Sequence, residues 1–164
     1  MQTLVRPCLP GQPMSDAEKQ LIAQLDWIDK MAGIYTTAHN ATLTLERNDF
    51  DFEALELIGD LDWNAGDGAE ALADAADQAL RENPLEIEYE ARWSAGYDPE
   101  PQKIIATLCL GGPTVRLSTS IDHRGNPIAE ETEGHFSWGV DSGTVDVPAD
   151  YHEALELFWQ LVAC

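Results

Sequence analysis

The sequence predicts an α+β fold: N-terminal helices, then a four-stranded antiparallel sheet and a C-terminal helix. Two observations carry this prediction. Apolar residues recur at helical spacing over 16–38 and 50–82, with 39–48 open between helix, strand and turn, and from residue 85 they alternate with polar residues, as in half-buried strands. Helices and strands are grouped along the chain rather than interleaved, which favours an antiparallel sheet. With 164 residues, 44% of them apolar, the chain can build one domain with a substantial core.

We expect residues 1–14, which include three prolines, to form an extended arm, and residues 15–164 to form a single α+β domain. Within that domain, residues 15–82 make an acidic helical part and residues 85–164 make the sheet and the C-terminal helix. The first helix is predicted over residues 16–38. It begins at Ser15-Asp16-Ala17-Glu18, which has the form of a capping box.

A second helical region is predicted from residue 50 to residue 82, where Asn83-Pro84 ends it. The segment 63–68 leaves open whether this region is one helix or two. Strands are predicted at 85–93, 103–110, 114–121 and 128–138. The strand at 103–110 is apolar on both faces, which favours a central position in the sheet. The final helix follows residue 150, and we expect it to cover one face of the sheet.

The composition excludes several classes of function. The chain carries 30 acidic against 9 basic residues, a formal net charge of -21, whereas general nucleic-acid binders and polybasic membrane-surface proteins need clustered Lys and Arg. No apolar run approaches the roughly 18 residues that span a bilayer, and the N-terminus has no long apolar segment typical of a secretory signal. Three Cys without CxxC spacing indicate a reducing, cytoplasmic setting. The four His lack metal-ligand spacing, so we expect neither metal nor cofactor.

The negative charge is concentrated between residues 46 and 90, which hold fifteen acidic and two basic residues. Acidic residues recur there at intervals of three, four or seven, so on a helix they would share one arc of about 120°. A second acidic row alternates along the predicted strand 85–93, with carboxylates about 6.6 Å apart, close to the phosphate spacing of one nucleic-acid strand. The candidate partner-binding residues are Glu53, Glu56, Asp60, Asp67, Glu70, Asp74 and Asp77 in the helical region, and Glu86, Glu88 and Glu90 in the strand.

Residues 85–127 contain LEIEYEARW, IIATLCLGGPTVRLS and DHRGNP. In this pattern the chain resembles small acidic accessory proteins of phages and plasmids. Its acidity is similar to that of the DNA-mimic proteins that phages and conjugative elements use against restriction enzymes or CRISPR complexes. The resemblance implies an inhibitor of a host defence nuclease or nucleoprotein, in the cytoplasm of a bacterial host cell. It carries over no functional residues.

Our hypothesis is therefore a non-enzymatic anti-CRISPR or anti-restriction inhibitor. Its acidic surface would occupy the basic groove of a CRISPR effector or restriction enzyme, with no direct contact to nucleic acid or membrane. The oligomeric state stays open. One alternative is an accessory protein–protein interaction module whose acidity only maintains solubility. A second is a small hydrolase with a site near His123 or His135. The five Trp are expected as core or rim anchors rather than base-stacking platforms, because no basic groove accompanies them.

Overall fold

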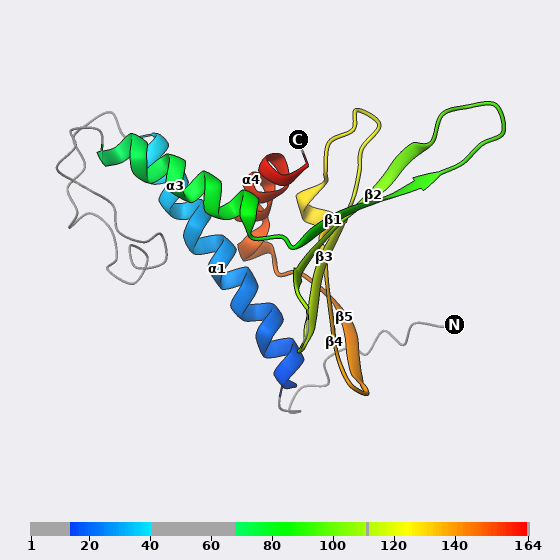
Figure 1. Ribbon diagram of the computed structural model, residues 1–164, viewed down its shortest axis with the longest axis horizontal. Coiled ribbons are helices and arrows are strands. Elements are labelled where there is room, and N and C mark those ends of the chain that lie inside the picture. Colours follow the sequence, from blue (N-terminus) through cyan, green and yellow to red (C-terminus); the bar gives the residue numbers. More distant parts are fainter. Residues whose placement is uncertain (1–13, 41–67, 111, 164) are drawn as a thin grey trace.

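The computed structural model describes residues 14–40, 68–110 and 112–163, and these form an α+β fold (Figure 1). The three described α-helices lie on one side of a five-stranded antiparallel sheet. The helices are α1 (Asp16–His39), α3 (Gly68–Glu82) and α4 (His152–Val162). The strands are β1 (Glu86–Arg92), β2 (Glu100–Cys109), β3 (Thr114–Ser120), β4 (Glu133–Trp138) and β5 (Asp141–Asp146), and the short 3-10 turns are η3 (Ala129–Glu131) and η4 (Ala149–Tyr151).

Helix α1 begins at the predicted capping box. The backbone N–H of Glu18 donates to the Ser15 hydroxyl oxygen over 3.1 Å, which satisfies one of the free donors in the first turn. Behind this cap, residues spaced three and four apart are fully buried, among them Leu21, Leu25 and Ile28. The prediction of a helix over 16–38 is confirmed, with the end of the helix at His39.

The sheet is a simple meander with strand order β1-β2-β3-β4-β5. The prediction of four strands is wrong, because β5 also pairs with β4 along its whole length. Strand β5 has the sequence DSGTVD, in which Val145 is the one large apolar residue, so hydrophobic alternation does not reveal it. The fourth strand also starts later than predicted, because residues 129–131 form η3.

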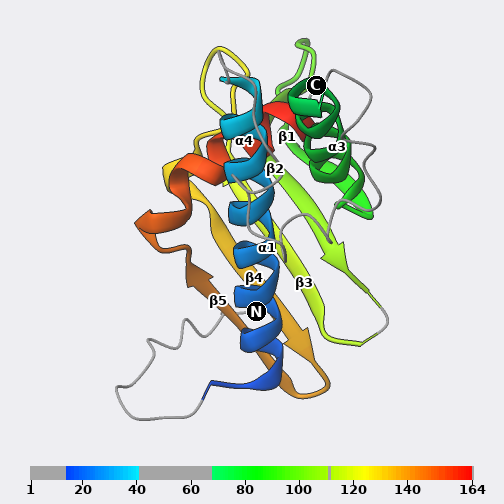
Figure 2. The ribbon, with the colours of Figure 1, turned by 90° about the vertical axis from the view of Figure 1, so that its left-hand side faces the viewer.

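Helix α1 lies across β3 and β4 and forms the main contact between the helices and the sheet (Figure 2). Gly134 in β4 permits this approach: a Cβ atom there would lie 2.5 Å from Cδ2 of Leu21. Helix α4 is on the same side, as predicted, but it packs mainly against α1, α3 and η3. Its fully buried Trp159 donates from Nε1 to the Thr132 hydroxyl over 3.0 Å.

Candidate interaction surface

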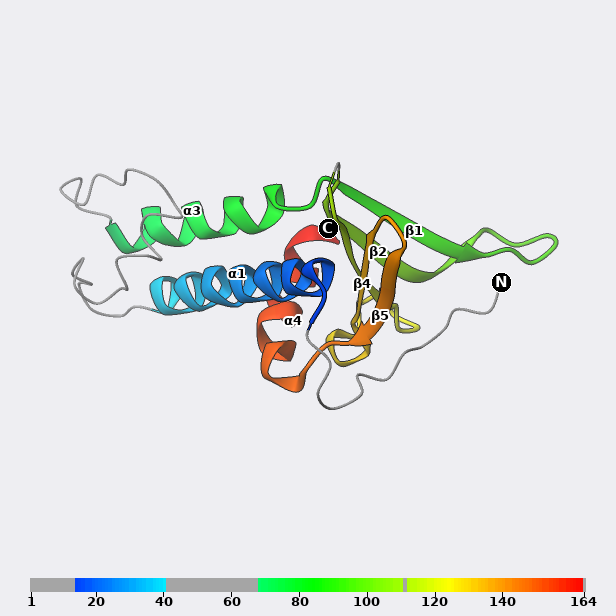
Figure 3. The same cartoon turned by 90° about the horizontal axis from the view of Figure 1, so that it is seen from below.

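The face of the sheet turned away from the helices is polar, and no described helix covers it (Figure 3). In β1, the register sets Glu86 opposite Thr107 and Glu90 opposite Lys103, with Glu88 between them on the same face. All three carboxylates are exposed, and none forms an ion pair with another described residue. The predicted acidic row on this strand therefore exists as a structural feature.

The second predicted row is described only in part. Glu70 and Asp74 of α3 are exposed, whereas Asp77 is half-buried and pairs through Oδ2 with Nε of Arg81 at 2.8 Å. Nη1 of Arg81 also donates to the carbonyl oxygen of Leu161 over 2.7 Å, so this ion pair helps to join α3 to α4. The other four residues of this row lie outside the described residues: Glu53, Glu56, Asp60 and Asp67. Whether residues 50–82 form one helix or two also depends on residues that the structure does not describe.

The two acidic rows belong to different layers of the molecule. Helix α3 packs in the helical layer against α1 and α4, and it leads directly into β1 at the edge of the sheet. The row of Glu86, Glu88 and Glu90 lies on the opposite, uncovered face of that edge strand. The exposed carboxylates of α3 and those of β1 therefore do not share one flat face.

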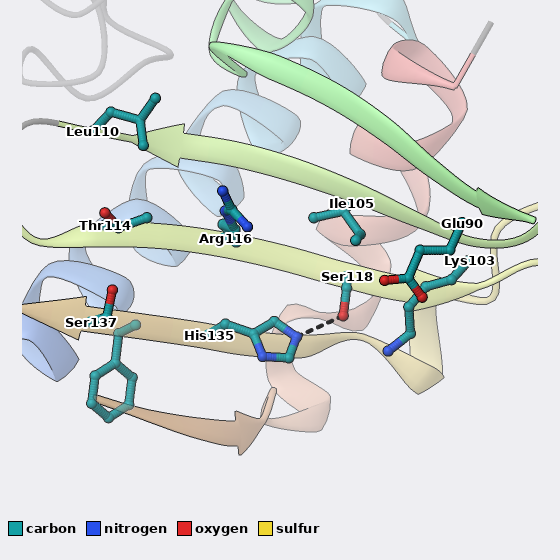
Figure 4. Close-up of a pocket in the computed structure, with 10 residues that line it drawn as sticks. Glu90, Lys103, Ile105, Leu110, Thr114, Arg116, Ser118, His135 and Ser137 are labelled. Atoms are coloured by element: carbon teal, nitrogen blue, oxygen red, sulfur yellow. Dashed lines mark hydrogen bonds between the residues drawn. The ribbon is translucent and has the colours of Figure 1, made fainter. Parts of the chain in front are cut away.

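A shallow hollow of about 490 Å³ lies in the middle of the uncovered face (Figure 4). Its lining combines charged, hydroxyl and apolar side chains: Glu90, Lys103, Ile105, Leu110, Thr114, Arg116, Ser118, His135, Phe136 and Ser137. Nζ of Lys103 lies 3.3 Å from Oε2 of Glu133. The guanidinium of Arg116 is exposed and forms no ion pair within the described part of the chain.

His135 joins three strands through both ring nitrogens. Its Nε2 lies 2.7 Å from Oγ of Ser118, and its Nδ1 lies 3.0 Å from Oγ1 of Thr144. Burial lowers the pKa of His135, and the nearby Lys103 and Arg116 lower it further, while Glu133 acts in the opposite direction. The sequence alone did not indicate the contact between Ser118 and His135, because it depends on the register between β3 and β4.

The contact between Ser118 and His135 bears on the alternative of a small hydrolase. A hydroxyl hydrogen-bonded to an imidazole is the first requirement of a nucleophile and base pair. Ser118, however, is 1% exposed, and the third partner of the network is the uncharged Thr144. His123 lies elsewhere, exposed in a turn where Oδ1 of Asp122 accepts the backbone N–H groups of Arg124 and Asn126, and these bonds lower the pKa of Asp122.

The hairpin that joins β1 to β2 extends beyond the rest of the sheet (Figures 1 and 3). Every residue from Glu88 to Gln102 is exposed, and this stretch includes Trp93 (77% exposed) and Tyr97 (79% exposed). The expectation of core or rim anchors holds for Trp159, which is buried, and for Trp27, which is partly buried. Trp93 does not lie in the core, Trp138 is half exposed, and Trp63 lies outside the described residues.

Among the described residues there is no group of three or more His, Cys, Asp or Glu side chains that could hold a metal ion. None of the helices in residues 14–40, 68–110 and 112–163 has both the length and the apolar character to cross a membrane. Comparison of the chain with protein-family models, curated proteins and solved structures gave no match.

Proposed function

We propose that this protein is a non-enzymatic inhibitor that binds a basic, nucleic-acid-binding groove of a host defence complex, a CRISPR effector or a restriction enzyme. The observation that carries the proposal is the row of Glu86, Glu88 and Glu90 on the uncovered face of an edge strand. The three carboxylates are exposed and lack ion-pair partners among the described residues.

The spacing of this row supports phosphate mimicry. Residues two apart on a strand are separated by about 6.6 Å, so a rigid strand presents negative charges at regular intervals, as a nucleic-acid strand does. Like charges this close repel one another, and no ion pair with a described residue offsets that repulsion. A positively charged partner would remove that repulsion on binding.

The net charge of -21 supports the same proposal through kinetics. A field of this size attracts a cationic groove over long distances and raises the association rate, and salt weakens the effect. If the acidity served solubility alone, the interface would instead be apolar, and binding would persist at high salt. Salt dependence therefore separates the proposed inhibitor from an accessory interaction module.

The test is affinity capture from a bacterial lysate that carries restriction and CRISPR systems, with three forms of the protein. The first is the wild type. The second carries Glu86→Lys, Glu88→Lys and Glu90→Lys. The third is a control with the same change of charge, Asp29→Lys, Asp150→Lys and Glu153→Lys, at exposed positions on α1, η4 and α4.

We expect the wild type and the control to retain a nucleic-acid-binding complex that excess duplex DNA displaces, and the β1 variant to lose it. Equal capture by all three forms would contradict the proposal, and so would a partner that stays bound in both excess DNA and high salt.

A further inference from the structure

The exposed aromatic residues of the β1–β2 hairpin have no role in the core. Trp93 and Tyr97 are among the most exposed large side chains described, and every residue from Glu88 to Gln102 is exposed. A two-stranded ribbon without a packed face is marginally stable in water. Large aromatic groups on such a ribbon therefore contribute little to folding, and they are the side chains that dominate the binding energy of protein interfaces.

The hairpin leaves the sheet at a defined place. The pairing of β1 with β2 shifts register between Glu90 and Ala91, which indicates a bulge, and bulges bend and twist a strand. Within the turn itself, Gly96 has a φ of +87°, a conformation that glycine adopts without strain. On the sheet side of the bulge, the Tyr89 hydroxyl donates to the carbonyl oxygen of Ala163 over 3.2 Å, which ties this end of the hairpin to the body.

The charge around the two aromatic residues determines what they can bind. The hairpin carries four acidic residues, Glu88, Glu90, Asp98 and Glu100, and one basic residue, Arg92. A ring that stands among carboxylates favours a cation over an anion or a nucleic-acid base. Arginine fits this combination better than lysine, because its planar guanidinium stacks on an aromatic face and also pairs with a carboxylate through two hydrogen bonds.

We propose that the hairpin Glu88–Gln102 is an arginine-recognition arm, in which Trp93 and Tyr97 stack on guanidinium groups of the partner's groove while the neighbouring carboxylates pair with them. The inference rests on the proposed function and names the side chain that the acidic surface recognises. It differs from plain phosphate mimicry in one respect: the aromatic residues add a preference for arginine beyond the one that bidentate pairing with carboxylates gives.

The experiment uses two synthetic peptides of equal length and charge, one of alternating arginine and glycine and one of alternating lysine and glycine. Calorimetry gives the affinity of each for the full-length protein, and amide chemical shifts locate the binding site. We expect the arginine peptide to bind about fivefold more tightly or better, since the planar guanidinium stacks on two aromatic faces and the compact lysine ammonium does not. The largest shifts should lie between residues 88 and 102.

Three variants separate the aromatic contribution from the charge. The double variant Trp93→Ala, Tyr97→Ala should lose most of the preference for the arginine peptide and keep only the part that bidentate pairing with carboxylates gives. Trp138→Ala, a change at another half-exposed Trp on β4, should leave the preference for arginine intact. Glu88→Gln with Glu90→Gln should weaken both peptides by a similar factor.

Equal affinity of the wild type for the two peptides, or an arginine preference that the double aromatic variant leaves undiminished, would overturn this inference and leave the proposed function standing. Failure of the proposed function would look different: removal of the β1 carboxylates would then have no effect on either peptide or on capture of the nucleic-acid-binding complex.

Discussion

The two faces of the sheet differ in what holds their side chains in place. On the face beneath α1, residues such as Ile104 and Leu117 are completely buried and fixed by packing. On the other face, Arg116 and the β1 carboxylates are exposed, and the contacts are hydrogen bonds and ion pairs such as those of His135 and Lys103. If the proposed function holds, stability and recognition occupy opposite faces of the same strands, and substitutions on one face should leave the role of the other unchanged.

Substitutions at two neighbouring residues of β3 should differ most in their effect on the free energy of unfolding. Leu117→Ala removes a fully buried side chain from the covered face and should lower the free energy of unfolding by about 2–5 kcal/mol. Arg116→Ala changes the exposed position next to it and should alter that free energy by less than about 0.5 kcal/mol. Chemical denaturation of both variants measures the difference. Similar losses for the two would mean that the uncovered face also supports the fold.

A substitution at Gly134 tests how closely α1 must pack against the covered face of the sheet. Gly134→Ala introduces a Cβ atom 2.5 Å from the buried Leu21 side chain, so α1 or β4 must shift, at an expected cost of about 1–3 kcal/mol. Gly112→Ala is the matched control, since a Cβ atom there would meet no atom within 4 Å. Thermal melts that rank Gly112→Ala below Gly134→Ala in stability would contradict this account of the packing.

His135 makes the uncovered face sensitive to pH. Its pKa in the folded protein lies below the ordinary value of 6.5, so the unfolded chain binds more protons in the range between the two values. The free energy of unfolding should therefore fall as pH decreases below about 6.5, and this loss should be smaller for His135→Gln. The measurement is denaturation at several pH values. If the free energy of unfolding had the same pH dependence in the wild type and in His135→Gln, His135 would not be its cause.

The acidic row itself should have the smallest effect on stability. Replacing Glu86, Glu88 and Glu90 by Gln removes like-charge repulsion and should raise the free energy of unfolding by a few tenths of a kcal/mol at low salt. The gain should vanish at high salt, where these exposed charges are screened. Denaturation at two salt concentrations checks this. A marked loss of stability would show that the carboxylates make contacts that support the fold.

Local signals predicted the first helix and the strands at 85–93, 103–110 and 114–121, because caps and hydrophobic alternation depend on neighbouring residues. Strand β5 escaped prediction because its pairing with β4, rather than apolar alternation, defines it. The acidic strand row was predictable for the same reason as the strand. The contact of His135 with Ser118 and Thr144 was not, since it requires the register of three strands. The exposure of Trp93 was missed because the length of an unsupported hairpin is a tertiary property.

The most direct test of the central claim, that the β1 carboxylates take the place of nucleic-acid phosphates, is an equilibrium competition. The complex captured by the wild type is titrated with labelled duplex DNA at increasing concentrations of this protein. The account predicts that the apparent Kd for DNA rises linearly with the concentration of wild-type protein, and that the variant with Glu86→Lys, Glu88→Lys and Glu90→Lys leaves it unchanged. An unchanged apparent Kd for DNA while the wild-type protein remains bound to the complex would contradict the claim.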